Sequence, residues 1–298
     1  MSFAIKIPSS TSNLGAGFDS IGLALNLYLE LEVEKAGEWE FIPTSKTLES
    51  LPPDKDNFVY QIAARVARQH GVDQLPPCRV KVKSDIPLAR GLGSSATATL
   101  AGIELANQLL DLGLDTHDKL EIATAIEGHP DNVAPSLLGG CVIGHYQEDV
   151  DCVKLPFDNV SLIAVIPEFE LKTKKAREAL PQQFSFQTSV HASSMANVSV
   201  AAICQQNWSL LGKMMNKDLF HQPYRKKLVP HFESLQTYLQ DKVHGLFLSG
   251  AGPTVIALAD KDCPDSSIAE WKNQFPTCQW LKLQVDNNGM VVRKAETP

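Results

Sequence analysis

Alternation of apolar and polar positions marks the first long element of the chain. From Ile21 to Val33 every odd position is apolar, and from Glu30 onward the even positions carry glutamates. A period of two residues is typical of a β-strand with one buried face and one solvated face. A shorter alternation at residues 3–7 predicts a strand that precedes it.

Apolar residues recur at helical spacing through the rest of the first half. They predict helices at about 57–70 and 100–110, and a third helix from about residue 120 that Pro130 stops. A strand is expected around Val80 and Val82, ahead of a loop rich in glycine and serine.

The second half mixes short strands and helices without a regular βαβ order. It is expected to contain a buried strand at 162–166, helical stretches at 191–216 and 226–241, strands at 245–249 and 254–259, and a final strand pair around Asn287-Asn288-Gly289. This mixture predicts an α+β fold. A chain of 298 residues exceeds the usual size of a single core, and the polar stretch near 147–158 divides it into domains at 1–155 and 156–298.

The composition of the chain excludes some classes of function. The formal net charge of -7 argues against general nucleic-acid binding, so a phosphate ligand needs local loop amides, a few cations or a metal. The six cysteines form no C-x-x-C pair, which favours buried thiols in a reducing compartment. The N-terminus lacks the pattern of a signal peptide, and no apolar run is long enough to span a membrane. We therefore expect a cytoplasmic protein without membrane partners.

The loop after the predicted strand at 80–82 carries the strongest chemical signal. It reads Pro87-Leu88-Ala89-Arg90-Gly91-Leu92-Gly93-Ser94-Ser95-Ala96-Thr97, and a helix follows it. Its glycines permit sharp turns, while its amides and the helix N-terminus suit an anion. It is neither a Walker loop nor a dinucleotide fingerprint. From the residues alone, a plain connection in which a serine caps the helix is an equal alternative.

The pattern Pro-x-x-x-Gly-Leu-Gly-Ser-Ser-Ala resembles the signature loop of the GHMP kinase superfamily. The segments Ser12–Asp19 and Ser249–Thr254 resemble the first and third motifs of that superfamily, in the same order. The resemblance spans nearly the whole chain. It implies a two-domain fold, with an N-terminal half like ribosomal protein S5 domain 2 and a ferredoxin-like C-terminal half.

Two further segments resemble the homoserine kinases within this superfamily. They are Glu127–Pro135, followed by Gly139-Gly140, and Thr173–Arg177. This resemblance implies an ATP-dependent transfer of phosphate to the hydroxyl of L-homoserine, with Mg²⁺, in threonine biosynthesis. It also implies a homodimer. Another GHMP-type kinase, of mevalonate or phosphomevalonate type, and a non-catalytic nucleotide-binding relative remain as alternatives.

The resemblance also assigns roles to individual residues. Residues 87–97 and Asn57 would bind the nucleotide. Ser95 would ligate the metal together with Glu121, because the family has a glutamate eleven residues ahead of the position of Asn132. A hydroxyl and a carboxylate are hard oxygen ligands, which Mg²⁺ prefers.

The amino acid would be held by a second group of residues. Arg177 and Arg225 can supply donors to its carboxylate, and Asp19 can accept from its ammonium. The remaining predicted contacts are Asn13, His129, Asn132 and Thr173. Asn132, together with Ser95 and Glu121, is predicted to act in catalysis, and it stands where relatives carry an aspartate base. Asp19 is an alternative proton acceptor.

Overall fold

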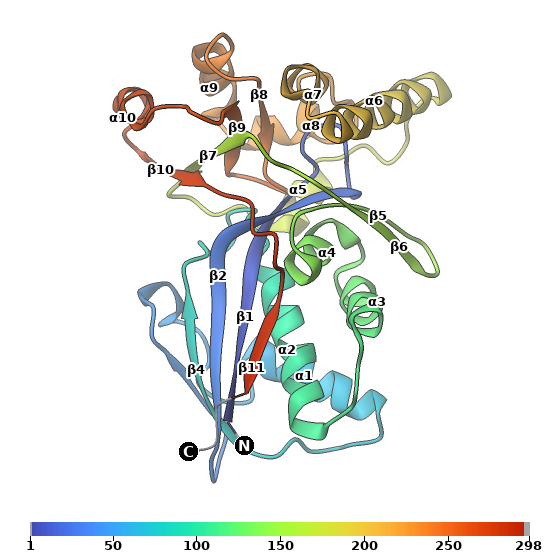
Figure 1. The fold of residues 1–298 in the computed structure, drawn as a ribbon, viewed down its shortest axis with the longest axis vertical. Coiled ribbons are helices and arrows are strands. Elements are labelled where there is room, and N and C mark those ends of the chain that lie inside the picture. The colour runs from blue at the N-terminus through green and yellow to red at the C-terminus, as the bar shows by residue number, and fades with distance from the viewer. Residues whose placement is uncertain (1, 295–298) are drawn as a thin grey trace.

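Two β-sheets build the structure, a computed structural model that describes residues 2–294 (Figure 1). The first sheet has the order β11-β1-β2-β4-β3, and β5 extends it by pairing with β2 and with β6. Its strands are β1 (Ser2–Ser12), β2 (Ile21–Lys35), β3 (Glu40–Pro43), β4 (Cys78–Ser84), β5 (Cys141–Tyr146), β6 (Val150–Leu155) and β11 (Val291–Lys294).

The alternation that predicts β2 reflects its two faces. The even-numbered glutamates of its outer part stand opposite lysines of β4 in the register, with Glu30 facing Lys83 and Glu32 facing Lys81. The odd-numbered side chains Leu31 and Val33 are buried. Opposite charges paired across one face and apolar packing on the other account for the strand and its register.

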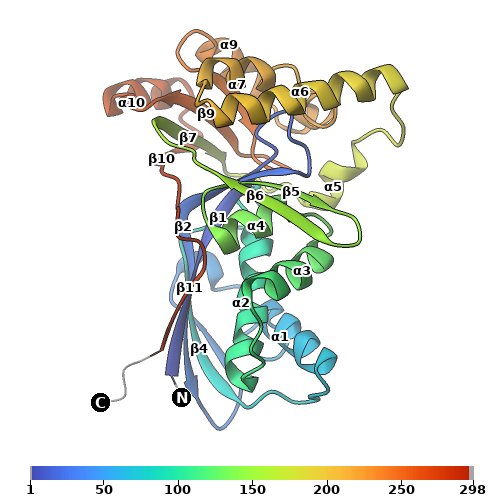
Figure 2. The same ribbon diagram turned by 45° about the vertical axis from the view of Figure 1, so that its right-hand side comes forward.

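Helices cover one face of the first sheet in both views (Figures 1 and 2). They are α1 (Phe58–Gln69), α2 (Ser94–Leu110), α3 (Thr116–Glu127) and α4 (Pro130–Leu138). The sequence predicts the first three, but it misses α4 because Pro130 was expected only to end a helix. Pro130 instead begins α4, at the first helical position, where the missing N–H costs no hydrogen bond.

The second sheet is antiparallel, with the order β10-β7-β9-β8. Its strands are β7 (Val160–Pro167), β8 (Gly245–Leu248), β9 (Val255–Asp260) and β10 (Cys278–Leu283). Figure 1 places α6 (Phe186–Cys204), α7 (Trp208–Met215), α9 (Phe232–Leu239) and α10 (Asp265–Gln274) on its side away from the first sheet. Four short helices complete the fold of residues 2–294: α5 (Thr173–Glu178), α8 (Gln222–Arg225), η1 (Lys46–Leu48) and η2 (Lys226–Leu228).

The expected strand pair around residues 287–289 is wrong. The turn does form, and Asp286 Oδ1 accepts hydrogen bonds from the amides of Asn288 and Gly289. The strands on its two sides, however, join different sheets, because β10 pairs with β7 and β11 pairs with β1. The turn therefore carries the chain back to the first sheet, so residues 291–294 belong with the N-terminal half.

Within the described part of the chain, one of two buried apolar clusters runs through both halves, and the other, which includes Trp271 and Trp280, lies in the C-terminal half alone. Phe157 and Trp208 pack with ring centroids 4.6 Å apart, and Phe247 of the second sheet belongs to the same buried cluster as β1 and β2. The α+β prediction is confirmed. Among residues 2–294, no helix combines the length and the apolar character that a bilayer crossing requires.

Candidate active site

A cavity of about 550 Å³ brings three distant segments of the chain together. Its walls include the turn after β1, the loop before α2, and the segment that leads into α5. The cavity also receives Arg225 of α8 and Gly250 from the loop after β8. The three motifs that carry the family resemblance therefore meet at one site.

The loop before α2 is held by close backbone contacts that only glycine allows. Gly91 and Gly93 have φ values of +78° and +71°. A Cβ on Gly91 would lie 2.2 Å from the Ser249 carbonyl oxygen, and one on Gly93 would lie 2.3 Å from Ser10 Oγ. Gly93 caps α2 without any side-chain hydrogen bond, so the alternative of a serine cap is not what the structure contains. The first-turn residues of α2 line the cavity, and the free amides of a helix N-terminus are of the kind that suits an anion.

Most of the predicted nucleotide residues line the cavity. They are Leu88, Ala89, Gly91, Gly93, Ser94, Ser95, Ala96, Thr97 and Asn57. The side chain of Asn57 is already engaged, because it accepts from the amide of Val59 and donates to the Pro52 carbonyl. Asn57 thus shapes the cavity wall as the N-cap of α1.

Pro87, Arg90 and Leu92 are absent from the cavity wall, contrary to their predicted role in binding the nucleotide. Leu92 is buried in the core. The guanidinium of Arg90 donates to the carbonyls of Leu88, Pro167 and Glu168 instead. A side chain that satisfies carbonyls of its own chain is turned away from a phosphate.

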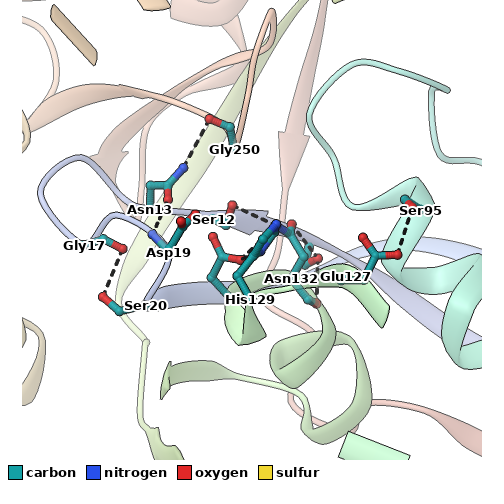
Figure 3. A network of polar contacts seen from close by, with 12 residues as sticks. Ser12, Asn13, Gly17, Asp19, Ser20, Ser95, Glu127, His129, Asn132 and Gly250 are labelled. Atoms are coloured by element: carbon teal, nitrogen blue, oxygen red, sulfur yellow. Dashed lines mark hydrogen bonds and ion pairs between the residues drawn. The ribbon is translucent and has the colours of Figure 1, made fainter. Parts of the chain in front are cut away.

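Ser95 meets a carboxylate, but from a different glutamate than the predicted one. Ser95 Oγ donates to Glu127 Oε1 at 2.9 Å (Figure 3). Thr99 Oγ1 donates to the same oxygen at 2.7 Å. Glu127 is the last residue of α3 and lines the cavity. Both hydroxyls engage one carboxylate oxygen, so Oε2 accepts neither of these hydrogen bonds.

The structure does not bring Glu121 to this site. Glu121 pairs with His117 at 3.3 Å on the exposed side of α3 and does not line the cavity. Six residues along an α-helix turn the side chain by about 600°, so Glu121 and Glu127 point in directions about 120° apart. Counting eleven residues back from Asn132 therefore selects the wrong face of the helix.

Asn132 lies between β1 and the cavity. Its Nδ2 donates to Ser12 Oγ at 3.0 Å, and its Oδ1 accepts from Ser10 Oγ at 3.2 Å. The carbonyl oxygen of Asn132 also accepts from Ser10 Oγ. These contacts hold the side chain amide in one orientation at the cavity wall (Figure 3).

His129 forms a hydrogen-bonded ion pair through Nδ1 with the buried Asp131. Burial alone would lower the pKa of His129, but the hydrogen bond and charge of Asp131 outweigh it and raise that pKa. Burial alone would raise the pKa of Asp131, and the same contact with His129 lowers it. The contact therefore favours the charged form of both groups, and both residues line the cavity.

Asp19 and Arg177, both predicted to contact the substrate, form an ion pair with each other. Arg177 donates two parallel hydrogen bonds, from NH1 to Oδ2 at 3.0 Å and from NH2 to Oδ1 at 2.9 Å. The amide of Asp19 donates to Asn13 Oδ1, and Asn13 Nδ2 donates to the Gly250 carbonyl. The first and third motifs are joined by these bonds, and α5 closes the site through Arg177.

Arg225 is the buried cation of the site. Its NH1 donates to the Gly250 carbonyl at 3.1 Å. Burial, followed by the charge of Arg177, lowers the pKa of Arg225 to about 10. Both guanidinium groups lie over the ring of Phe18, at 5.7 Å for Arg177 and 5.1 Å for Arg225. The site therefore concentrates positive charge beside two carboxylates, Asp19 and Asp131, which line the same cavity. Thr173, at the start of α5, also lines the cavity.

Sequence reasoning missed four residues that shape this site: Glu127, Asp131, Ser12 and Phe18. Glu127 was available as the last helical residue before Gly128. The others act through buried hydrogen bonds and ring contacts, which leave no spacing signal in the sequence.

Known proteins resemble the chain over nearly its full length. The family described as GHMP kinases N terminal domain matches residues 57–140, and the one described as GHMP kinases C terminal matches residues 199–277. A homoserine kinase of Bacillus pumilus is 48% identical over 98% of this chain and 94% of its own length. The chain belongs to the GHMP kinase family. It is thus an ATP-dependent kinase that acts on a hydroxyl group, as the sequence predicts.

Solved structures agree with this membership. A homoserine kinase from Cytophaga hutchinsonii has a TM-score of 0.84 and 29% identity, covering 98% of this GHMP kinase and 97% of that chain. A mevalonate diphosphate decarboxylase from Staphylococcus aureus has a TM-score of 0.70 at 18% identity, with 98% of both chains covered. The second likeness supports the fold alone.

Proposed function

We propose that this GHMP kinase transfers the γ-phosphoryl group of ATP to the side-chain hydroxyl of L-homoserine, in threonine biosynthesis. The observation that carries the proposal is the charge pattern around Phe18, where Asp19 stands beside Arg177 and Arg225. The ammonium group of an amino-acid zwitterion can pair with a carboxylate of the protein, and the carboxylate of the zwitterion can pair with a guanidinium. The relatives named homoserine kinase support the same substrate.

The cavity has one part that suits the base of the nucleotide and another that suits its phosphates. Its apolar wall comes from β2, β3, β4, η1 and the start of α1, through Leu29, Phe41, Leu48, Phe58 and Val82. An apolar wall suits a base, and the loop amides at the N-terminus of α2 suit the phosphates. Because β3 is an edge strand and β1 lies beyond β2 and β4, the base would lie away from the Asp19 turn.

The pair Ser95 and Glu127 fits a magnesium ion. Neighbouring ligands of an octahedral Mg²⁺, each about 2.0–2.1 Å from the metal, lie about 2.9 Å from one another. Ser95 Oγ and Glu127 Oε1 have this separation of 2.9 Å and are both hard oxygen donors. When bound there, Mg²⁺ would neutralise charge on the phosphates. We therefore replace Glu121 by Glu127 in the proposed metal site.

The other proposed contribution to catalysis is the positioning of the two substrates. The α2 amides would hold the phosphates, and Arg177 and Arg225 would orient the amino acid so that its hydroxyl meets the γ-phosphorus in line. The amide of Asn132, fixed by Ser10 and Ser12, would orient the hydroxyl rather than remove its proton, since an amide is no base. This assigns Asn132 a catalytic contact without general-base chemistry.

A coupled ADP-release assay with L-homoserine, mevalonate and galactose, each with ATP and Mg²⁺, tests the proposal. We expect turnover with L-homoserine and background rates with the other alcohols. Turnover with mevalonate instead would favour the mevalonate-type kinase. Nucleotide binding without turnover of any alcohol would favour a non-catalytic relative.

Three predictions from the sequence accompany this proposal. They are a homodimer, a cytoplasmic location and a division near residue 155, the last amended by the return of β11 to the first sheet. Size-exclusion chromatography with light scattering measures the first directly, and a mass of one chain would contradict it.

A further inference from the structure

The guanidinium of Arg90 connects the phosphate-binding loop to the segment that leads into α5. Its Nε donates to the Pro167 carbonyl at 3.1 Å and NH1 donates to the Leu88 carbonyl at 2.9 Å. NH2 donates to the Glu168 carbonyl, and NH1 pairs with Glu170 at 3.3 Å. The Arg90 side chain is only 15% exposed, so its contacts with the Pro167 and Leu88 carbonyls are partly buried, whereas the side chain of Glu170 is 59% exposed.

The backbone continues the same connection. The Leu171 amide donates to the Ala89 carbonyl at 3.2 Å, and the Thr254 amide donates to the Arg90 carbonyl at 3.3 Å. Ser249 Oγ donates to the Gly91 carbonyl at 2.6 Å. The loop is therefore attached on one side to residues 167–171 and on the other to the third motif.

Residues 167–171 lead directly to the substrate side of the cavity. Leu171, Lys172 and Thr173 line the cavity, and α5 then presents Arg177 to Asp19. A shift of the loop on binding phosphate would be transmitted to α5 through a few residues and a rigid planar side chain.

We propose that Arg90 is a positioning residue that couples the two ligand sites, so that nucleotide at the loop and amino acid at Arg177 each strengthen binding of the other. The inference rests on the proposed function, because it takes L-homoserine as the second ligand. It gives Arg90 a role other than phosphate contact. A lysine could not replace it, since one ammonium group cannot match the planar fork that reaches carbonyls on both segments.

The test is a binding cycle by calorimetry. The dissociation constant of L-homoserine is measured with and without a saturating non-hydrolysable ATP analogue and Mg²⁺, in the wild type, Arg90→Met and Arg90→Lys. Arg68→Met, on the exposed side of α1 and outside the cavity, is the matched control. The readout is the ratio of the two constants, which linkage requires to be the same when the nucleotide is titrated instead.

We expect a ratio of about fivefold or more in the wild type and Arg68→Met, within the usual range of coupling between sites. We expect a ratio close to one in both Arg90 variants. A purely structural role would lower thermal stability and leave the ratio intact. A wild-type ratio of one, or an undiminished ratio in Arg90→Met, would overturn the inference. A full ratio in Arg90→Lys would overturn the role of the planar fork.

A wild type that binds the nucleotide analogue but no L-homoserine would overturn the proposed function, which separates the two failures. Should the Arg90 variants not fold, amide hydrogen exchange of residues 168–178 in the wild type gives the answer. We expect the nucleotide analogue alone to slow exchange in this segment. Unchanged exchange would count against the coupling.

Discussion

Whether a glutamate of α3 reaches Ser95 depends on which face of the helix it lies on. Glu127 ends α3 at the cavity, whereas Glu121 lies on the exposed face beside His117. A family spacing counted along the sequence does not preserve a helical face, because each inserted or deleted residue rotates the side chain by about 100°. The proposed metal site keeps the predicted pair of a hydroxyl and a carboxylate, but the carboxylate beside Ser95 comes from Glu127.

Replacing each glutamate singly by alanine distinguishes the role of Glu127 from that of Glu121. We expect Glu127→Ala to lower kcat by about 10²-fold or more, because it removes a preorganised charge at the transferring phosphate. Glu121→Ala should keep the wild-type kcat, since its side chain is exposed and outside the cavity. Steady-state kinetics at saturating ATP and Mg²⁺ measure the kcat of both variants. A large loss of kcat in Glu121→Ala alone would contradict the choice of Glu127 and favour Glu121 as the metal ligand.

The ion pair of His129 and Asp131 makes a prediction about pH. The raised pKa of His129 contributes stability fully below 6.5, and that contribution is lost as the pH rises through the folded-state value. The lowered pKa of Asp131 contributes stability above 3.8, lost as the pH falls through its folded-state value. The wild type should therefore exceed Asp131→Asn in stability most clearly between pH 3.8 and 6.5.

Denaturant unfolding of both proteins across this range measures the difference, and an NMR titration of the His129 ring supplies the cause. In Asp131→Asn, burial remains without the carboxylate, so the pKa of His129 should fall below 6.5. The same ring pKa in both proteins would contradict the assignment.

Residue types in a motif were easier to predict than the contacts between motifs. Asn13, Asp19, Asn132, Thr173, Arg177 and Arg225 all reach the cavity as expected. Asp19 and Arg177 are 158 positions apart, and only the fold shows that they pair with each other. Arg90 belonged to the right loop, yet its side chain serves carbonyls of another segment, which spacing cannot reveal.

At the scale of elements, the start of α2 is set by Gly93. Its backbone is left-handed, and the missing Cβ leaves room for Ser10. We expect Gly93→Ala to lose about 1–2 kcal/mol from the backbone alone, and more from the clash with Ser10. Nucleotide affinity should fall by about tenfold or more, which corresponds to 1.4 kcal/mol.

Gly113→Ala is the matched control, because Gly113 also has a positive φ of +69° but no atom within 4 Å of an added Cβ. Gly113→Ala should lose a similar amount of unfolding free energy from backbone strain and should bind nucleotide with normal affinity. Thermal unfolding and calorimetry with ADP and Mg²⁺ measure the two effects. Normal nucleotide affinity in Gly93→Ala would contradict the role of this turn.

Elements with a strong period were predicted, and so were the short strands β8 and β9, whereas β3, β5, β6 and α10 were not. β2 and the helices α1 to α3 follow from periodicity, whereas α4 was hidden by a proline at its first position. The turn at 287–289 has the residues of a hairpin, but pairing partners are decided by long-range contacts. A turn signal predicts a change of direction, and the sheet that each strand joins depends on the rest of the core.

At the scale of the whole molecule, we expect the apolar cluster that both halves share to make them unfold together, although a second cluster belongs to the C-terminal half alone. Phe247 is fully buried in the cluster that also contains residues of β1 and β2. We expect Phe247→Ala to lose about 3–5 kcal/mol. Scanning calorimetry should show one transition that moves to lower temperature. Two transitions, with only one of them shifted, would contradict a common core.

The central claim is that phosphate passes from ATP to the hydroxyl of L-homoserine in the cavity bounded by α2, α3 and α5. Phosphorus NMR of a reaction containing the protein, ATP, Mg²⁺ and L-homoserine tests it most directly. The account predicts a phosphomonoester signal split by the two protons of the neighbouring methylene group, with ADP formed in equal amount. Consumption of ATP that releases only inorganic phosphate, or no consumption at all, would contradict it.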